Sequence, residues 1–299
     1  MSRKILCPID FSPGSQQALR AAVRLAMDGD TELVLAHAWY LPPLAHAGET
    51  PFPAQLIDEM VTGEEAALAT AVCDAQDLGA PRVASLFLTG LPWQRICDTA
   101  EADPAFDLIV MGTEGRTGLR RLLLGSVAEK VVRHAPCSVL AVRGKNGSSR
   151  FHHILCPIDF SPSSREAMER AARLADHDGL GITLLHVLDL PVRFSGEPNV
   201  AGFLEDLDRT SARHLAEWAA EIRTRVSVPV IMRTRIGSPG AQVLSVLDAE
   251  PSFDLVVVGS HGRTGLRRAF LGSVAERIVR HAPCPVFVAR HREVSGVAP

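Results

Sequence analysis

The sequence predicts an α/β protein made of two tandem domains, each a five-stranded parallel sheet with helices on both faces. Short apolar runs alternate with segments of helical period, as in parallel sheets that helices cover on both faces. The segment Ile5–Pro13 recurs unchanged at Ile154–Pro162, and 26 of the 38 positions from Phe106 to Arg143 are identical in Phe253 to Arg290. A repeat of about 148 residues has the size of a domain. We predict domains over residues 1–146 and 151–292, because Gly144–Arg150 has linker composition.

In the first unit, Ser12 and Pro13 form an N-cap and first-turn pair, which predicts a helix from there to about Asp28. A polar and proline-rich insertion runs from Leu41 to Pro53. The other expected elements are strands at Lys4–Asp10, Leu33–Ala38, Arg82–Leu88, Phe106–Met111 and Ser138–Val142, and helices at Ala54–Leu78, Pro92–Ala102 and Val127–His134.

The second unit repeats this order. Its expected strands lie near residues 153–159, 182–188, 229–235, 253–258 and 285–289, and its helices near 163–176, 201–225, 239–249 and 273–281. Ligands of such sheets bind beyond the carboxyl ends of the strands, where the strand order reverses. A strand order of 3-2-1-4-5 would therefore bring Asp10, at the end of the first strand, to the loop after the fourth.

That loop is rich in glycine and occurs twice, as G-x2-G-x9-G-S from Gly112 to Ser126 and from Gly259 to Ser273. Each copy joins a buried strand to the start of a helix. Glycine allows close approach of a ligand, and the first amides of a helix are unpaired donors at its positive end. The pattern predicts an anion site, most often one for phosphate. The alternative is structural, because Ser126 and Glu129, like Ser273 and Glu276, fit a capping box that needs no ligand.

Asp10 and Asp159 are the second candidate element of the site. Ser12 and Ser161 stand directly before prolines and are better placed as helix caps. The aspartates would thereby be available to accept hydrogen bonds from a ligand. The alternative is a solvated or turn-stabilising carboxylate.

Two common nucleotide-binding motifs are absent, since the loops match neither G-x-x-x-x-G-K-[ST] nor G-x-G-x-x-G. Neither loop contains a lysine. Both contain arginines, and Arg116 and Arg263 are either solvated or in contact with phosphate.

Composition excludes other classes of function. The net charge of −3 gives no electrostatic case for nucleic acid or an anionic membrane. No run of 18 apolar residues and no signal peptide is present, so we expect a cytoplasmic protein without membrane spans. The six cysteines form no C-x-x-C pair and are expected to be buried, reduced thiols, and no metal site is expected.

Together, the start Cys7–Ser12, the glycine loop and the closing strand Ser138–Val142 resemble a universal stress protein of the ATP-binding type, here in tandem over nearly the whole chain. The resemblance implies Rossmann-like (HUP-type) domains that bind ATP or AMP, with or without Mg²⁺, and that pair through their fifth strands. Further homodimerisation stays open. By position, the implied contacts to base, ribose and phosphates are Ile9, Asp10, Ala38, Met111, Gly112, Gly115, Gly125, Ser126 and Val127, and in the second unit Ile158, Asp159, Val187, Val258, Gly259, Gly262, Gly272, Ser273 and Val274. Glu114 departs from the family pattern, where a neutral or basic residue such as His261 is usual, and predicts weaker binding in the first unit.

Three functions remain open from the sequence. The first is a nucleotide-dependent stress-response regulator that is not an enzyme and acts on an unknown protein partner. The second is a slow ATPase or nucleotidyl-transferring enzyme on the same fold. The third is a nucleotide-free pairing scaffold. The absence of lysine from the glycine loops argues against fast phosphoryl transfer.

Overall fold

The computed structural model describes residues 3–27, 30–41, 53–113, 124–143, 151–189, 200–262 and 271–291. The chain divides into two compact units between Ser149 and Arg150. The predicted linker Gly144–Arg150, most of the predicted insertion and the loop residues Glu114, Gly115, Arg116 and Arg263 lie outside the described residues.

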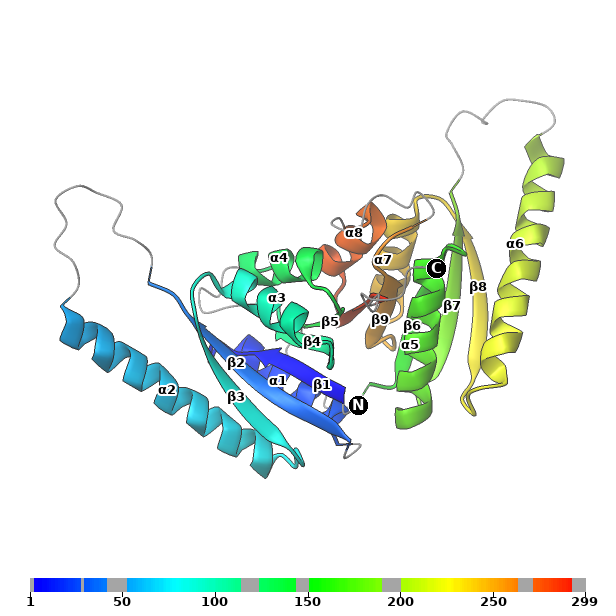
Figure 1. Ribbon diagram of the computed structural model, residues 1–299. Coiled ribbons are helices and arrows are strands. Elements are labelled where there is room, and N and C mark those ends of the chain that lie inside the picture. Colours follow the sequence, from blue (N-terminus) through cyan, green and yellow to red (C-terminus); the bar gives the residue numbers. More distant parts are fainter. Residues whose placement is uncertain are drawn as a thin grey trace, which may run out of the picture. The chain divides into compact units, whose positions relative to one another are not determined.

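Unit 1 is a parallel sheet with the strand order 3-2-1-4-5, as predicted (Figure 1). Its first strand ends earlier than expected, because the chain turns after Pro8 rather than after Asp10. In chain order the elements are β1 (Arg3–Pro8), α1 (Pro13–Leu25), β2 (Thr31–Trp39), α2 (Ala54–Asp77), β3 (Val83–Thr89), α3 (Pro92–Ala102), β4 (Phe106–Gly112), α4 (Ser126–His134) and β5 (Ser138–Val142).

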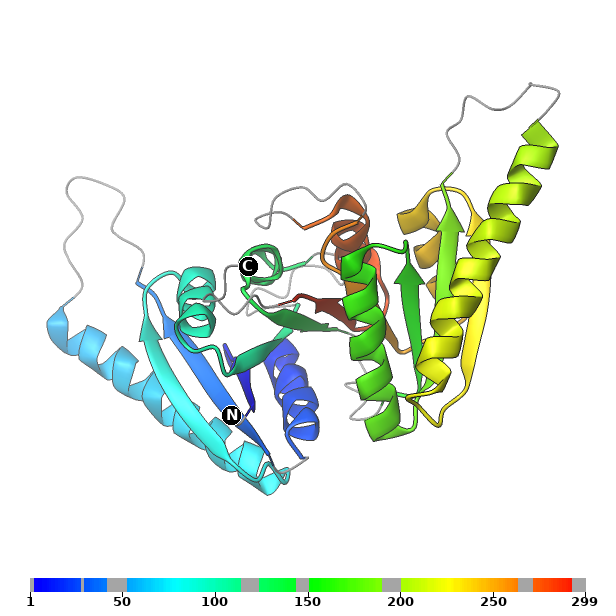
Figure 2. The same ribbon diagram turned by 45° about the vertical axis from the view of Figure 1, so that its right-hand side comes forward.

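Unit 2 repeats this topology, with the strand order β8-β7-β6-β9-β10 (Figure 2). Its elements are β6 (His153–Ile158), α5 (Pro162–Asp178), β7 (Gly181–Leu188), α6 (Val200–Arg223), β8 (Val230–Ile236), α7 (Pro239–Ala249), β9 (Leu255–Gly259), α8 (Ser273–His281) and β10 (Val286–Ala289).

Helices cover both faces of each sheet, which explains why the central strands are apolar throughout. In unit 1, α1 and α2 lie on one face and α3 and α4 on the other (Figure 1). Leu6, Leu33 and Ile109 on three neighbouring strands are fully buried between these layers. Leu155, Ile182 and Val256 take the same places in unit 2 and are also fully buried. This burial removes apolar surface from water and is the main stabilising contribution to each unit.

The turn after the first strand is built in the same way in both units. The Oγ atoms of Ser12 and Ser161 accept hydrogen bonds from the amides of Ser15 and Ser164 at 3.2 and 3.1 Å, so the predicted serine caps are confirmed. Phe11 and its counterpart Phe160 have φ angles of 62° and 64°. This left-handed conformation strains the backbone of a bulky residue. Because both copies adopt it, the surrounding contacts must fix the turn.

The expectation for the cysteines holds for four of the six. Cys7, Cys137, Cys156 and Cys284 are buried, and burial raises the pKa of the Cys7 thiol to about 12. Cys73 is exposed and Cys97 is partly exposed, which corrects the prediction that all six are buried. The reason is that both lie on helices, whose outer faces reach solvent. All six are free thiols.

None of the described helices is long and apolar enough to cross a membrane.

Candidate functional site

In unit 1 the carboxyl ends of β1, β2 and β4 meet the start of α4 around a cavity of about 460 Å³. This is the crevice where the strand order reverses, as expected for ligand sites in open parallel sheets. Every predicted unit 1 contact that the structure describes lines the cavity, namely Ile9, Asp10, Ala38, Met111, Gly112, Gly125, Ser126 and Val127. Their roles toward a ligand stay predictions.

In unit 2 the corresponding residues come from the same element ends. Ile158 ends β6 and Gly259 ends β9. Asp159 and Gly262 lie close together, since a Cβ atom on Gly262 would be 3.1 Å from Asp159 Oδ2. The first strand and the glycine loop are thus brought together as predicted. Of the remaining predicted contacts, the buried ones are Val187 and Val258, and those at the start of α8 are Gly272, Ser273 and Val274.

Backbone hydrogen bonds close the base of both glycine loops. The amide of Gly125 donates to Thr113 O at 2.8 Å, and that of Gly272 donates to Ser260 O at 2.8 Å. Thr113 and Ser260 in turn donate their amides to Val142 O and Ala289 O on the neighbouring strands. The start of α4 or α8 is therefore fixed to the end of the sheet.

The capping-box alternative is wrong in both units. α4 begins at Ser126 and its N-cap is Gly125, while α8 begins at Ser273 and its N-cap is Gly272. Neither N-cap makes a side-chain capping hydrogen bond, because the serine stands one position too late and glycine has no side chain. Both helices therefore present their first amides at the site without a side-chain cap, at the positive end of the helix dipole. This arrangement suits an anionic group.

The first loop glycine is required by packing. A Cβ atom on Gly112 would lie 2.6 Å from the backbone C and O of Gly14, and one on Gly259 would lie 2.6 Å from those of Ser163. These contacts are shorter than van der Waals distance. The end of β4 approaches α1 closely, and the end of β9 approaches α5 closely. Packing therefore explains why these positions carry glycine, without any ligand.

The last loop glycine of unit 2 has no such explanation in the described chain. Gly272 has φ −62° and ψ 146°, which any residue adopts. A Cβ atom there would meet its nearest neighbours at 3.4 Å, an ordinary contact. At Gly125 the contact would be tighter, at 3.0 Å from Thr113 O. The absence of a side chain at Gly272 is what close approach of a ligand to the backbone would require.

The turn-stabilising alternative is confirmed for one oxygen of Asp10 and of Asp159. Oδ1 of Asp10 accepts hydrogen bonds from the amide of Ser12 at 3.1 Å and from its hydroxyl at 2.6 Å. Oδ1 of Asp159 accepts from the amide of Ser161 at 3.0 Å. The expectation that the serine caps leave these carboxylates available is therefore wrong for Oδ1, because one oxygen stabilises the turn before the helix.

We expect Asp159→Ala to have two effects. It should weaken ATP binding in unit 2 by roughly 1–3 kcal/mol and lower the free energy of unfolding by about 1 kcal/mol, because the predicted hydrogen bond to the ligand and the observed turn hydrogen bond would both be lost. Asp159→Asn is the control, since its amide oxygen can still accept from Ser161. Calorimetric titration with ATP and urea unfolding without ligand measure the two quantities. Unchanged affinity in both variants would mean that Asp159 stabilises the turn and does not contact the ligand.

The cavity of unit 1 also has a wall that the sequence did not predict. It is made by Trp39 at the end of β2, by Tyr40 directly after it, and by Met60 and Glu64 on α2. His37 lies at its base. Its Nδ1 donates to the carbonyl of Ile9 at 2.8 Å, since a carbonyl can only accept, and its Nε2 is 3.5 Å from Glu64 Oε2. The sequence held a signal for His37, because a histidine stands inside an apolar strand in both units, as His37 and His186. It held no such signal for Glu64, because the second unit has no acidic residue at the matching position.

In unit 2, His186 donates Nδ1–H to Ile158 O at 2.7 Å, and its ring packs 4.6 Å from that of Phe160. Phe160 meets the edge of Trp218 on α6 at 5.4 Å, and the guanidinium of Arg165 lies 4.4 Å from the Trp218 ring centre. This stack joins α6 to the end of β6.

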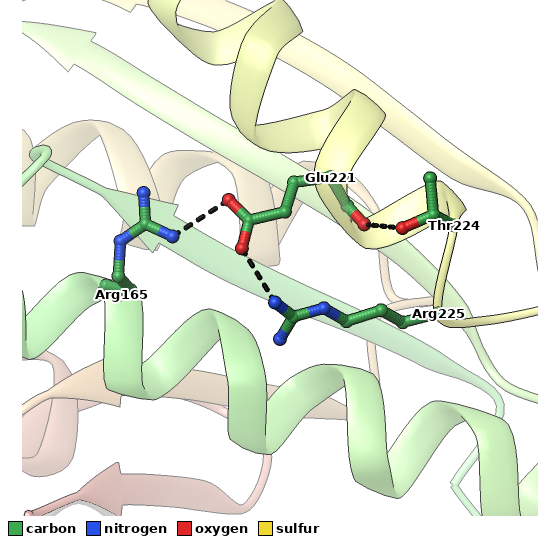
Figure 3. A network of polar contacts seen from close by, with 4 residues as sticks. All are labelled: Arg165, Glu221, Thr224 and Arg225. Atoms are coloured by element: carbon green, nitrogen blue, oxygen red, sulfur yellow. Dashed lines mark hydrogen bonds and ion pairs between the residues drawn. The ribbon is translucent and has the colours of Figure 1, made fainter.

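Polar contacts strengthen the same junction (Figure 3). Glu221 on α6 accepts from Arg165 on α5 at 2.8 Å and from Arg225 at 2.9 Å, and its backbone oxygen accepts from the Thr224 hydroxyl. The hydrogen bond from Arg165 holds the pKa of Glu221 below its usual value. α6 is thus fixed to α5 by a charged pair as well as to the end of β6 by aromatic packing.

Within the described ranges, no group of three or more His, Cys, Asp or Glu side chains could hold a metal ion.

Comparison with known proteins gives consistent matches over both units. The model of the universal stress protein family matches residues 1–143 and again 150–290. A universal stress protein of Mycolicibacterium smegmatis is 28% identical over 292 residues, which cover 96% of this chain and 97% of that protein. One from Methanocaldococcus jannaschii is 38% identical over 144 residues, covering 47% of this chain and 82% of that protein. The crystal structure of a universal stress protein from Archaeoglobus fulgidus has the same fold, with a TM-score of 0.70 and 23% identity over 98% of this chain and 100% of that one.

Proposed function

Because this chain belongs to the universal stress protein family, as two tandem copies, we propose that it is a nucleotide-dependent regulator that binds ATP at the glycine loop of each unit. The phosphates would lie against the first amides of α4 and α8. The ribose hydroxyls would donate to Asp10 and Asp159, and the base would lie against the end of β2 or β7. The protein would act in the cytoplasm through a protein partner.

The observation that carries this proposal is Gly272. Neither its backbone angles nor its neighbours in the described chain call for glycine, and it caps a helix that has no side-chain cap. A phosphate group in contact with the backbone accounts for both features. The unit 1 cavity of about 460 Å³ falls within the roughly 300–1,000 Å³ range of small-molecule sites.

We propose binding rather than catalysis as the function. Among the lining residues that the structure describes, none is a lysine, and phosphoryl transfer relies on cations that neutralise developing charge. Slow ATP hydrolysis is the alternative. β5 and β10 are the strands through which we propose that the two units pair, with further homodimerisation as a second level of assembly.

Nucleotide analysis of the full-length chain, purified without denaturation, tests the function. We expect acid extraction and mass spectrometry to release ATP or AMP, in an amount approaching two per chain after incubation with excess ATP. Accumulation of ADP during incubation would instead support the slow ATPase. Absence of bound nucleotide even at millimolar ATP would contradict the proposal and would support the nucleotide-free pairing scaffold as the function.

A further inference from the structure

The cavity of unit 1 extends from one face of the sheet to the other. α2 packs on β2 and β3 on one face, whereas α4 lies with α3 on the opposite face (Figure 1). Both helices nevertheless line the same cavity, α2 through Met60 and Glu64 and α4 through Ser126 and Val127. The two helices therefore form opposite ends of it.

The two ends differ in the hydrogen bonds they can make. The α4 end presents helix amides, which donate and favour negative charge. The α2 end presents Glu64, which together with Asp10 supplies the carboxylates among the described lining residues; that lining contains no lysine or arginine. A ligand with phosphates at α4 would thus meet an acceptor at α2.

The surroundings of Glu64 favour a flat ring with a polar edge. Trp39, Tyr40 and Met60 supply apolar surface at this end. The Glu64 side chain is 24% exposed, and its Oε2 lies 3.5 Å from Nε2 of His37. His37 is itself held by the carbonyl of Ile9. The backbone amide of Ile9 donates to Ala36 O at 2.8 Å, so both backbone groups of Ile9 already have partners within the chain.

We propose that Glu64 makes unit 1 selective for nucleotides whose base carries a hydrogen-bond-donating amino group at its outer edge. This inference rests on the proposed nucleotide binding. An ionised carboxylate accepts hydrogen bonds and cannot donate them. A base that has no donor at this edge cannot make that hydrogen bond, and a site built around such a contact discriminates against that base.

The matching position on α6 of unit 2 is Ser211, because Ser211 precedes the first residue of β8 (Val230) by the same number of residues as Glu64 precedes the first residue of β3 (Val83), and both are half-buried. A serine side chain carries no charge. The selectivity is therefore a property of unit 1, and the two sites differ in the bases they accept.

The test compares ATP with purine riboside triphosphate, which lacks only the amino group of adenine. Calorimetric titration is done on the full-length chain carrying Gly272→Val, which we expect to remove binding in unit 2. We expect ATP to bind about tenfold more tightly, the lower end of the range for a hydrogen bond to a charged group because Glu64 is partly exposed. In Glu64→Ala this preference should fall to about twofold or less.

Glu65→Ala is the matched control, because Glu65 is the next residue of α2, carries the same charge, is exposed and does not line the cavity. It should keep the tenfold preference. Glu64→Gln, which keeps the side-chain shape, should lower the preference in the same direction even if Glu64→Ala is less stable. Two outcomes would overturn the proposed selectivity and leave nucleotide binding intact. They are equal binding of ATP and purine riboside triphosphate by the Gly272→Val chain that keeps Glu64, and an unchanged preference for ATP in both Glu64 variants. Binding of neither nucleotide would overturn the proposed nucleotide binding in unit 1 together with the selectivity.

Discussion

The Gly272→Val variant is expected to lose nucleotide binding in unit 2 by roughly 100-fold or more, equivalent to about 3 kcal/mol. A branched side chain at this position would occupy the space in which we place the phosphates, next to the first amides of α8. The fold should be retained, because the backbone angles suit any residue and a Cβ atom meets its neighbours at 3.4 Å. Calorimetric titration of the full-length chain should show the stoichiometry fall from two ATP per chain to one.

Gly202→Val serves as the control for this variant. Gly202 also lies in unit 2, on α6, and a Cβ atom there would meet nothing within 4 Å. It should bind two ATP per chain with unchanged affinity. A Gly272→Val protein that is folded by circular dichroism and still binds two ATP would refute the assignment of the phosphates to the start of α8.

The Gly259→Ala variant is expected to lose about 3 kcal/mol of unfolding free energy, because the added methyl group would overlap the backbone of α5. The added Cβ would be 2.6 Å from both C and O of Ser163 and 2.9 Å from its Cβ. These are backbone or near-backbone atoms of α5, which cannot move aside as the end of a flexible side chain can. Urea unfolding without nucleotide measures this loss. Gly112→Ala should have the same effect in unit 1, where the contact with Gly14 is the same.

Gly272→Ala is the comparison for this second variant, since it adds the same methyl group at another glycine of the same loop. We expect it to change the unfolding free energy by less than about 1 kcal/mol. If Gly259→Ala were as stable as Gly272→Ala, packing would not explain the first glycine, and its role would have to be sought in the ligand.

Local sequence signals were enough for the fold and for the position of the site. Ser12 before Pro13 specifies a helix start through a contact between neighbouring residues, and the apolar runs around Ile109 specify buried strands through burial on both sides. The repeat doubled each of these signals. Because the glycine loop begins at the end of β4 and the aspartate stands two residues after the end of β1, the strand order alone brings them together.

The roles of individual residues at the site were decided by tertiary contacts. Gly112 and Gly272 belong to the same repeated pattern, yet only the position of the α1 or α5 backbone shows that the first glycine is required by packing and that the last is not. Glu64 reaches the cavity because α2 packs across β2, which brings it to His37 from 27 residues further along the chain. A contact of this kind depends on how a helix is rotated against a sheet, and that rotation is set by the summed packing of many side chains rather than by any local motif.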